Sequence, residues 1–296
     1  MSPGWNDPVL EFVELVEAIA RSVPTIRRTE RVPGELALRV FVGPGDPATF
    51  FLHNLFHETR PMPPDARAHR VHHYLAAFAQ ALAVDGAASW ATARARLLPV
   101  VRHVELVANA AAGVGGPAGL VHRPFVDGVA ECVVIDDEAS MAYATTTDLS
   151  RWGVDARTAI DQARHNLAGR AYQGIEPVTR APYLLLQVAS RDDYESSRAV
   201  LPGWLASFAV HVGGTPVCAF PDRSTLFVTL AEDPAAVAHL LALAHHHFTG
   251  STRSISPLPY VALADGRLTP LVLPHGHPSA PSLAHATRAF ASRLPT

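Results

Sequence analysis

Two short turn sequences constrain the fold more than any other feature of this chain. Asp265 and Gly266 lie between two apolar runs in "LPYVALADGRLTPLVL", residues 258–273, and an Asp-Gly pair in this setting favours the tight turn of a β-hairpin. The segment "PDRS", residues 221–224, stands between the apolar runs "VCAF" and "TLFVTLA" and suits a second hairpin turn. Hairpin strands are antiparallel, so the C-terminal part of the chain is predicted to contain a mostly antiparallel sheet.

Helix and strand patterns alternate around these hairpins. "GVAECVVID" and "SMAYATTTD" are predicted to form another antiparallel pair that turns at "DDEA", because both are rich in β-branched or aromatic residues. "YLLLQVA" is predicted as an apolar strand. Two helices are predicted, one over "VDARTAIDQARHNLAG", which Asp155 caps and Gly169 ends, and one over "DPAAVAHLLALAHHHF", which opens on an Asp-Pro pair. These elements predict an α+β domain.

The N-terminal part is predicted to be richer in helix. An Asp-Pro pair at residues 7–8 opens a helix to residue 22, and "ELALRVFVG" alternates as a strand. Prolines separate the predicted helices "PATFFLHNLFHETR" and "PDARAHRVHHYLAAFAQALA", and a third is expected through "SWATARARLLPVV". The Ala- and Gly-rich run of residues 109–119 is typical of a linker or loop. We therefore expect a helix-rich region over residues 1–117 and the α+β domain over residues 118–296.

Composition excludes several classes of enzyme. All 24 basic residues are arginine, so Schiff-base lysines, pyridoxal phosphate attachment and the Walker A lysine are excluded. The net charge of −3 offers no broad basic surface to nucleic acid or an anionic membrane. Cys132 and Cys218 lie in apolar runs, which is typical of small buried side chains. With neither a signal peptide nor a spanning segment in the sequence, we expect a soluble cytoplasmic protein.

Four histidines are candidates for a metal site. His53 and His57 are four positions apart in one predicted helix, and His69 and His73 repeat this spacing in the next, so each pair shares a helix face. Four imidazoles on two adjacent helices could hold zinc or another divalent metal. The glutamate of an HExxH motif is absent, however, and the spacing is also typical of solvated or packing histidines. We therefore expect no cofactor and keep the metal site as an alternative.

Six segments carry a resemblance to a known family. In chain order they are "FFLHNLF", "RLLPVVR", "VVIDDEASMAYATTTDLSRWGV", "ARHNLAGR", "DDYESSRAVL" and "YVALADGRLTPLVL". Their order and spacing resemble the YtpQ-like family of uncharacterised bacterial proteins over residues 48–274. The chain departs from the family pattern in its Ala- and Gly-rich run and at His53. The resemblance implies a cytoplasmic bacterial fold and implies no activity.

Four residues in these segments are candidates for binding a ligand: Arg102, Asn166, Ser197 and Arg198. Arg102 ends an apolar run, Arg198 lies among apolar neighbours, and Asn166 lies on a predicted helix. An arginine in such surroundings needs a carboxylate or carbonyl partner, because an unpaired buried charge costs several kcal/mol. Each arginine therefore either forms a structural ion pair or recognises the carboxylate or phosphate of a ligand.

The stretch "DDYESSRAVLP", residues 192–202, holds two of these candidates. Asp192 and Glu195 have the spacing of a capping box, which opens a helix. Glu195 and Arg198 are then spaced to pair on the surface of that helix. Ser197 and Arg198 would lie in its N-terminal turn, where anions are favoured, and they are the candidates of this stretch for contact with a ligand.

Two functional hypotheses follow. The first is a non-catalytic binding or protein-interaction module that takes a protein partner or a small anionic ligand, and it is the one we expect. The alternative is a metal-dependent hydrolase or transferase with its site in the cleft between the two parts, carried by the four histidines. Neither nucleic acid nor a membrane is expected as a partner.

Overall fold

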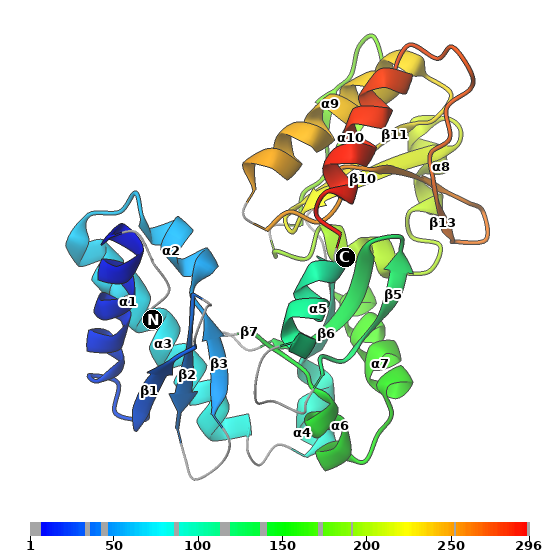
Figure 1. Cartoon of the computed structure of the whole chain (residues 1–296). Coiled ribbons are helices and arrows are strands. Elements are labelled where there is room, and N and C mark those ends of the chain that lie inside the picture. The colour runs from blue at the N-terminus through cyan, green and yellow to red at the C-terminus, as the bar shows by residue number, and fades with distance from the viewer. Residues whose placement is uncertain are drawn as a thin grey trace. The chain divides into compact units, whose positions relative to one another are not determined.

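Helices and antiparallel sheets make up the structure, a computed structural model that describes residues 7–32, 36–42, 47–85, 89–112, 119–136, 141–170, 174–190, 192–251 and 253–294. The chain divides into two units. Unit 1 comprises Met1–Thr92 with Asp136–Ala142, and unit 2 comprises Ala93–Ile135 with Tyr143–Thr296. The elements of both units, many of which are labelled in Figure 1, confirm the predicted α+β class.

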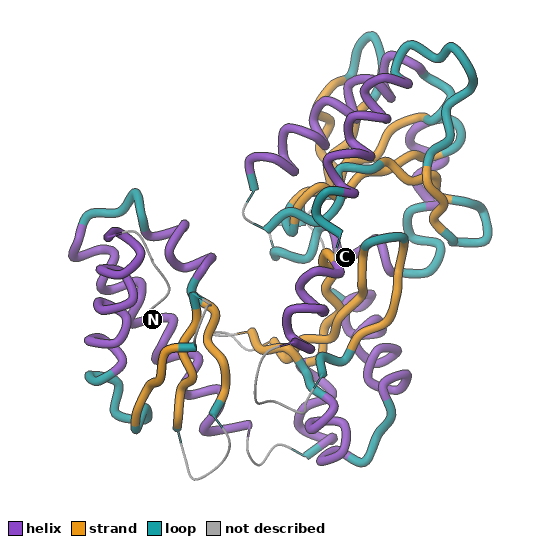
Figure 2. Tube along the Cα trace, in the orientation of Figure 1, coloured by secondary structure: helices purple, strands orange, loops and turns teal. Residues whose placement is uncertain are grey.

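Unit 1 combines a three-stranded antiparallel sheet with helices. Its elements are α1 (Asp7–Ala20), β1 (Arg28–Arg31), β2 (Ala37–Phe41), β3 (Ala48–Phe51), α2 (His53–Thr59) and α3 (Pro64–Asp85). The strands lie in the order β1-β2-β3, with the helices along one side of them (Figure 2). Phe12 and Val16 of α1, Leu38 of β2 and Leu75 of α3 meet in one buried apolar cluster. Burial of this cluster is the main stabilising contribution in the unit.

A smaller antiparallel sheet opens unit 2. Its strands are β4 (Leu97–His103), β5 (His122–Val126) and β6 (Val129–Asp136), and the short strand β7 (Met141–Tyr143) pairs with β6; Asp136 and the first two residues of β7 are counted with unit 1. The helical elements of this part of unit 2 are the 3₁₀ helix η1 (Arg94–Arg96), α5 (Val104–Ala112), α6 (Thr146–Trp152) and α7 (Ala156–Gly169), while α4 (Trp90–Ala93) lies at the division of the chain, with its first three residues in unit 1. β4, β5 and β7 all pair with β6, and α7 packs against β4.

A six-stranded antiparallel sheet follows in unit 2, in the order β13-β12-β10-β11-β9-β8. The strands are β8 (Ile175–Thr179), β9 (Leu185–Val188), β10 (Pro216–Asp222), β11 (Thr225–Leu230), β12 (Pro259–Ala262) and β13 (Leu268–Pro270). The helical elements are η2 (Ser196–Val200), η3 (Ala206–Phe208), α8 (Ala209–Val212), α9 (Pro234–Gly250) and α10 (Ala280–Ala291), with η2 and η3 being 3₁₀ helices. α9 and α10 pack against each other.

Both faces of the six-stranded sheet are buried, because successive side chains of a strand point to opposite faces. On one face, Val217 of β10 packs with Leu240 of α9. On the other face, Phe220 stacks on Tyr260 with ring centroids 5.0 Å apart. These two rings belong to a core that also contains Val101 of β4. The two sheets of unit 2 therefore share one apolar core.

The predicted hairpins and capped helices of unit 2 are confirmed. β10–β11 and β12–β13 are antiparallel pairs, and Gly266 has φ +83° in the second turn, a value that favours glycine. Asp155 accepts the N–H of Thr158 at the start of α7, and Asp233 accepts two N–H groups at the start of α9. Within the described ranges, no helix is long and apolar enough to cross a membrane.

Two segments predicted as helix contain strands. Residues 48–51 form β3, and residues 97–103 form β4. Six of the seven residues of β4 are buried, and such a continuous apolar run has no period that distinguishes a buried strand from a buried helix. Pro99 is the signal against the helix, since proline inside a helix removes a hydrogen bond and clashes with the preceding turn.

The division between the units differs from the predicted one. The proposed boundary at residues 117 and 118 lies outside the described residues, and the structure divides the chain between Thr92 and Ala93. β4 pairs with β6 from Leu97 to His103. These main-chain hydrogen bonds tie the segment after Ala93 to unit 2, and composition alone carries no information about such long-range pairing.

Glu131 of β6 is a fully buried carboxylate in the core of unit 2. Arg164 of α7 donates to both of its oxygens, from Nε to Oε1 at 2.7 Å and from Nη2 to Oε2 at 2.8 Å. Arg123 of β5 donates from Nε to Oε2 at 2.6 Å. The two guanidinium groups neutralise the carboxylate and join α7 and β5 to the central strand.

We expect Arg164→Met to lower the free energy of unfolding by about 3 kcal/mol, because it leaves a buried carboxylate with one partner, which is partly exposed. Arg157→Met on the same helix is the matched control, since Arg157 is 88% exposed and its Nε lies 3.7 Å from Asp161. Urea unfolding followed by circular dichroism measures both. Equal losses in the two variants would contradict a stabilising role for the Glu131 pairs.

Candidate anion-binding site

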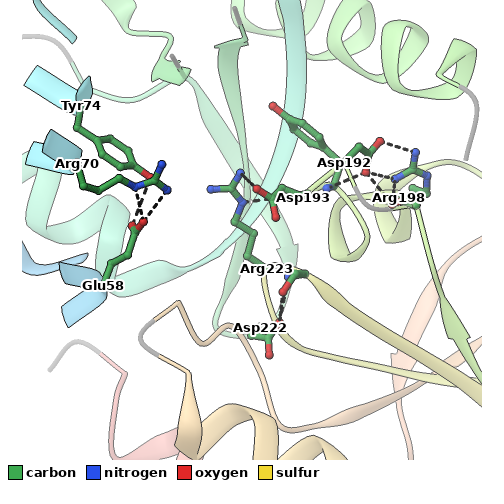
Figure 3. A network of polar contacts seen from close by, with 11 residues as sticks. Glu58, Arg70, Tyr74, Asp192, Asp193, Arg198, Asp222 and Arg223 are labelled. Atoms are coloured by element: carbon green, nitrogen blue, oxygen red, sulfur yellow. Dashed lines mark hydrogen bonds and ion pairs between the residues drawn. The ribbon is translucent and has the colours of Figure 1, made fainter. Parts of the chain in front are cut away.

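Most of the polar segment, residues 192–198, is buried rather than displayed on a helix surface, and Asp193 is its exposed residue. A 3₁₀ helix covers Ser196–Val200, and every residue from Tyr194 to Leu201 is buried. The predicted capping box is wrong, because Asp192 Oδ1 instead accepts the N–H of Tyr194 at 3.0 Å. The Asp192 side chain faces Arg198, as Figure 3 shows.

Arg198 and Asp192 form a two-point ion pair inside unit 2. Nη1 of Arg198 donates to Asp192 Oδ1 at 2.9 Å and to Ser190 Oγ at 2.9 Å, and Nη2 donates to Asp192 Oδ2 at 2.8 Å. Arg198 is 1% exposed. The predicted surface pair of Glu195 with Arg198 is therefore wrong, since both side chains are buried and the guanidinium binds Asp192.

This environment sets the charge state of Asp192. Burial acts to raise the pKa of the carboxyl group, but the hydrogen bonds from Arg198 and Ser190 and the charge of Arg198 outweigh it and lower the pKa to about 2. The carboxylate is therefore ionised throughout the neutral range and forms a charged pair with Arg198.

The two serines of the polar segment connect distant parts of unit 2. Ser196 Oγ donates to the main-chain oxygens of Asp222 and of Thr225, the latter at 2.8 Å. Ser197 Oγ accepts the N–H of Val101 at 3.4 Å. The segment thus holds β4 next to the turn between β10 and β11. Ser197, a predicted ligand contact, is 1% exposed and has this structural partner.

Asp222 fixes the same turn at the end of β10. Its Oδ1 accepts the N–H of Ser224 at 3.0 Å. Its Oδ2 lies 3.3 Å from Nδ1 of His247 on α9. The turn between β10 and β11 is therefore held by α9 as well as by the polar segment, so its residues have defined positions.

Arg223 occupies this turn and pairs with an exposed carboxylate. Nη2 of Arg223 donates to Asp193 Oδ2 at 3.0 Å, and Nε donates to the main-chain oxygen of Asp193 at 3.3 Å. The Arg223 side chain is 16% exposed, whereas that of Asp193 is 61% exposed. Figure 3 shows Arg223 reaching towards Asp193 while Asp192, the preceding residue, faces Arg198.

Two further arginines lie near Arg223, and we call the three the basic cluster: Arg102, Arg223 and Arg253. An antiparallel bridge joins Asp222 to Ser254, so the next residues, Arg223 and Arg253, stand opposite each other. Arg102 comes from β4, which the polar segment holds beside the turn. Burial first, and then the charges of Arg102 and Arg253, lower the pKa of Arg223, although Asp193 acts in the opposite direction.

Arg253 has the least engaged guanidinium of the basic cluster. Its side chain is half-buried, and it forms no hydrogen bond or ion pair with any residue that the structure describes. Arg102 donates from Nε to the Tyr143 hydroxyl at 2.7 Å and from Nη1 to the main-chain oxygen of Val101 at 2.8 Å. The sequence-predicted candidate Arg102 is thus part of the basic cluster, with one of its two terminal nitrogens free of these bonds.

Asn166 has a structural role at the start of β4. Its side-chain amide donates to the main-chain oxygens of Arg94 and Leu97, at 2.7 and 2.8 Å, and its Oδ1 accepts from Gln162. These bonds satisfy carbonyl groups of the 3₁₀ turn before the strand. The structure does not bring Asn166 together with the basic cluster.

The histidine candidates do not form a metal site in the part of the chain that is described. His69 and His73 are exposed on α3, while the side chains of His53 and His57 on α2 lie outside the described residues. Across the described ranges, no three His, Cys, Asp or Glu side chains are grouped to hold a metal ion.

Sequence reasoning missed Asp193, Arg223 and Arg253 as site residues. "PDRS" predicted the hairpin turn that carries Arg223, but a turn arginine is usually solvated, and no local pattern places it opposite Arg253. The two residues are 30 positions apart in the chain and meet only through the bridge between Asp222 and Ser254.

We expect Asp192→Asn to lower the free energy of unfolding at pH 7 by about 3 kcal/mol, because the variant leaves Arg198 buried without a carboxylate. The folded pKa of about 2 lies below the unfolded value of roughly 3.9. The ionised carboxylate therefore stabilises the fold above the unfolded pKa, and this contribution is lost as the pH falls towards the folded pKa.

Urea unfolding over a pH series checks this expectation. The difference between the unchanged protein and Asp192→Asn should shrink from about pH 5 downwards. Asp265→Asn is the control, since Asp265 forms an exposed pair with Arg267 in a separate turn. A difference that stays constant down to about pH 3 would argue against the ion pair as its cause.

Comparison with known proteins adds no relative to this geometry. A scan against protein-family models, and searches of the curated proteins and of the solved structures, found no match to this chain. The resemblance to the YtpQ-like family therefore stays a prediction that rests on the six segments that carry it.

Proposed function

We propose that this protein is a non-catalytic binding module and that it recognises an anionic ligand through the basic cluster of unit 2. One observation carries the proposal. Arg223, which pairs with Asp193 and is only 16% exposed, stands opposite Arg253, and the charges of Arg102 and Arg253 both act on it. Like charges held together in a half-buried setting are costly unless an anion is bound between them.

The chemistry of arginine favours an oxyanion as the ligand. A guanidinium presents N–H groups in a planar fork that matches carboxylate and phosphate oxygens. Arg253 and the remaining terminal nitrogen of Arg102 supply such groups. The turn and strand that carry the cluster are fixed by the polar segment, which supports recognition because little side-chain ordering is left to occur on binding.

The same chemistry supports binding rather than catalysis. Arginine stays protonated at neutral pH, so the basic cluster offers charge and hydrogen bonds and does not transfer protons. Burial raises the pKa of the Cys132 and Cys218 thiols to about 12, which makes both poor nucleophiles. These two free buried thiols and the family resemblance also support our proposal that the protein acts in a bacterial cytoplasm.

A metal-dependent hydrolase or transferase is the alternative that the histidine pairs suggest. Elemental analysis of protein purified without a chelator or a His-tag compares the two proposals. We expect no metal in stoichiometric amount. One zinc or iron per chain, lost in a variant with His69 and His73 both changed to Ala, would favour the enzyme.

We expect Arg253→Met to weaken the binding of sulfate, used as a probe anion, by at least about tenfold, because a hydrogen bond to a charged group contributes roughly 1.5–3 kcal/mol. The unfolding temperature should stay unchanged, since the Arg253 side chain has no partner among the described residues. Isothermal titration calorimetry in a low-chloride buffer measures the affinity.

Arg267→Met is the matched control for this experiment. Arg267 is 74% exposed and pairs with Asp265 in the turn between β12 and β13. The control removes one positive charge from unit 2 but none from the basic cluster. If sulfate fails to bind the unchanged protein, or if both variants lose the same affinity, the basic cluster is not the site.

A further inference from the structure

Asp193 already occupies the basic cluster as an internal anion. Its Oδ2 lies 3.0 Å from Nη2 of Arg223, and its backbone has φ +64°, a left-handed conformation that only aspartate, asparagine and glycine adopt readily. The side chain is 61% exposed, and among the described residues Arg223 is its ion-pair partner. An external anion can therefore take its place on Arg223.

The cluster carries more positive charge than Asp193 neutralises. Among the described residues, the three guanidinium groups of the basic cluster form one ion pair, that of Arg223 with Asp193, so two positive charges have no carboxylate partner there. Two neighbouring carboxylates are engaged elsewhere, since Asp192 binds Arg198 and Asp222 lies 3.3 Å from Nδ1 of His247. A ligand that brings the net charge of the basic cluster and Asp193 to zero therefore carries two negative charges.

Competition from Asp193 discriminates against singly charged ligands. A tethered group has an effective concentration in the millimolar range or above. A free monocarboxylate that displaces Asp193 from Arg223 exchanges one singly charged group for another, so the net gain in binding free energy is small. A dianion of the phosphate type places one negative charge on Arg223 and a second near Arg102 and Arg253. The second charge gives it a favourable electrostatic contribution to binding that a monoanion lacks.

We propose that the ligand carries a doubly charged, phosphate-type group and that Asp193 determines this specificity by occupying Arg223 in the empty site. The inference rests on the proposed function, since it requires that the basic cluster binds anions. It specifies the chemical class of the ligand, and it makes Asp193 a determinant of ligand specificity, a role that the arginines alone do not provide.

Titrations of the unchanged protein and of Asp193→Asn with sulfate and with acetate test this proposal. Asparagine tolerates the left-handed backbone of Asp193, so the variant removes the charge and keeps the turn. We expect the unchanged protein to bind sulfate at least about tenfold more tightly than acetate, because sulfate brings the second charge. In Asp193→Asn, acetate affinity should rise by about tenfold, since its competitor is gone. Asp265→Asn removes an equally charged, exposed residue and should leave both affinities unchanged.

The outcomes separate this proposal from the one on which it rests. If neither anion binds the unchanged protein or Asp193→Asn, the basic cluster is not an anion site and the proposed function fails. If sulfate binds but the preference for sulfate over acetate is the same in both proteins, the proposed function stands and the role of Asp193 is overturned. Equal affinity of the unchanged protein for sulfate and acetate would also overturn it.

Methyl phosphate and inorganic phosphate, titrated at about pH 8 where both are mainly dianions, identify the source of the group. Tighter binding of methyl phosphate assigns the site to the phosphate of a larger molecule, and tighter binding of inorganic phosphate assigns it to the free ion. Both results support a phosphate-type ligand. Binding of neither, with sulfate bound, would overturn that class.

Discussion

The buried ion pair between Arg198 and Asp192 is the interaction on which the proposed site depends. A guanidinium that is 1% exposed needs a carboxylate in direct contact, because the unpaired charge would destabilise the fold by several kcal/mol. The pair fixes both ends of the polar segment. Ser196 and Ser197, between those ends, then reach the β10–β11 turn and β4. An arginine outside the basic cluster thus helps to determine where the arginines of that cluster lie.

The role of each arginine depends on the partner with which it forms an ion pair. Arg164 binds the buried carboxylate of Glu131 and Arg198 binds the partly buried carboxylate of Asp192, each at two points, which stabilises the fold and leaves little of their charge available. Arg223 pairs with an exposed carboxylate, and Arg253 pairs with no described residue. Charge that the fold does not neutralise is available to a ligand. The basic cluster is therefore distinguished by its partners and not by its residue type.

Sequence reasoning identified several of these residues but left their roles open. It selected Arg102 and Arg198 together, since both are arginines in apolar surroundings. The structure makes Arg198 a structural residue and Arg102 a member of the basic cluster. The capping-box spacing of Asp192 and Glu195 was misleading, because the same side chain can cap a helix or accept from an arginine. Local spacing does not decide between these outcomes, whereas burial does.

The sequence by itself determined the elements that local chemistry specifies. Asp-Gly at residues 265–266 set a hairpin, Asp155 and Asp233 opened helices, and the absence of lysine excluded whole classes of enzyme. Only the tertiary structure decided that residues 97–103 form a strand paired with β6, and that Arg223 meets Arg253 across the bridge next to Asp193. The physical reason is range: turns and caps are set by hydrogen bonds within a few residues, whereas strand partners and charge clusters depend on contacts between segments far apart in the chain.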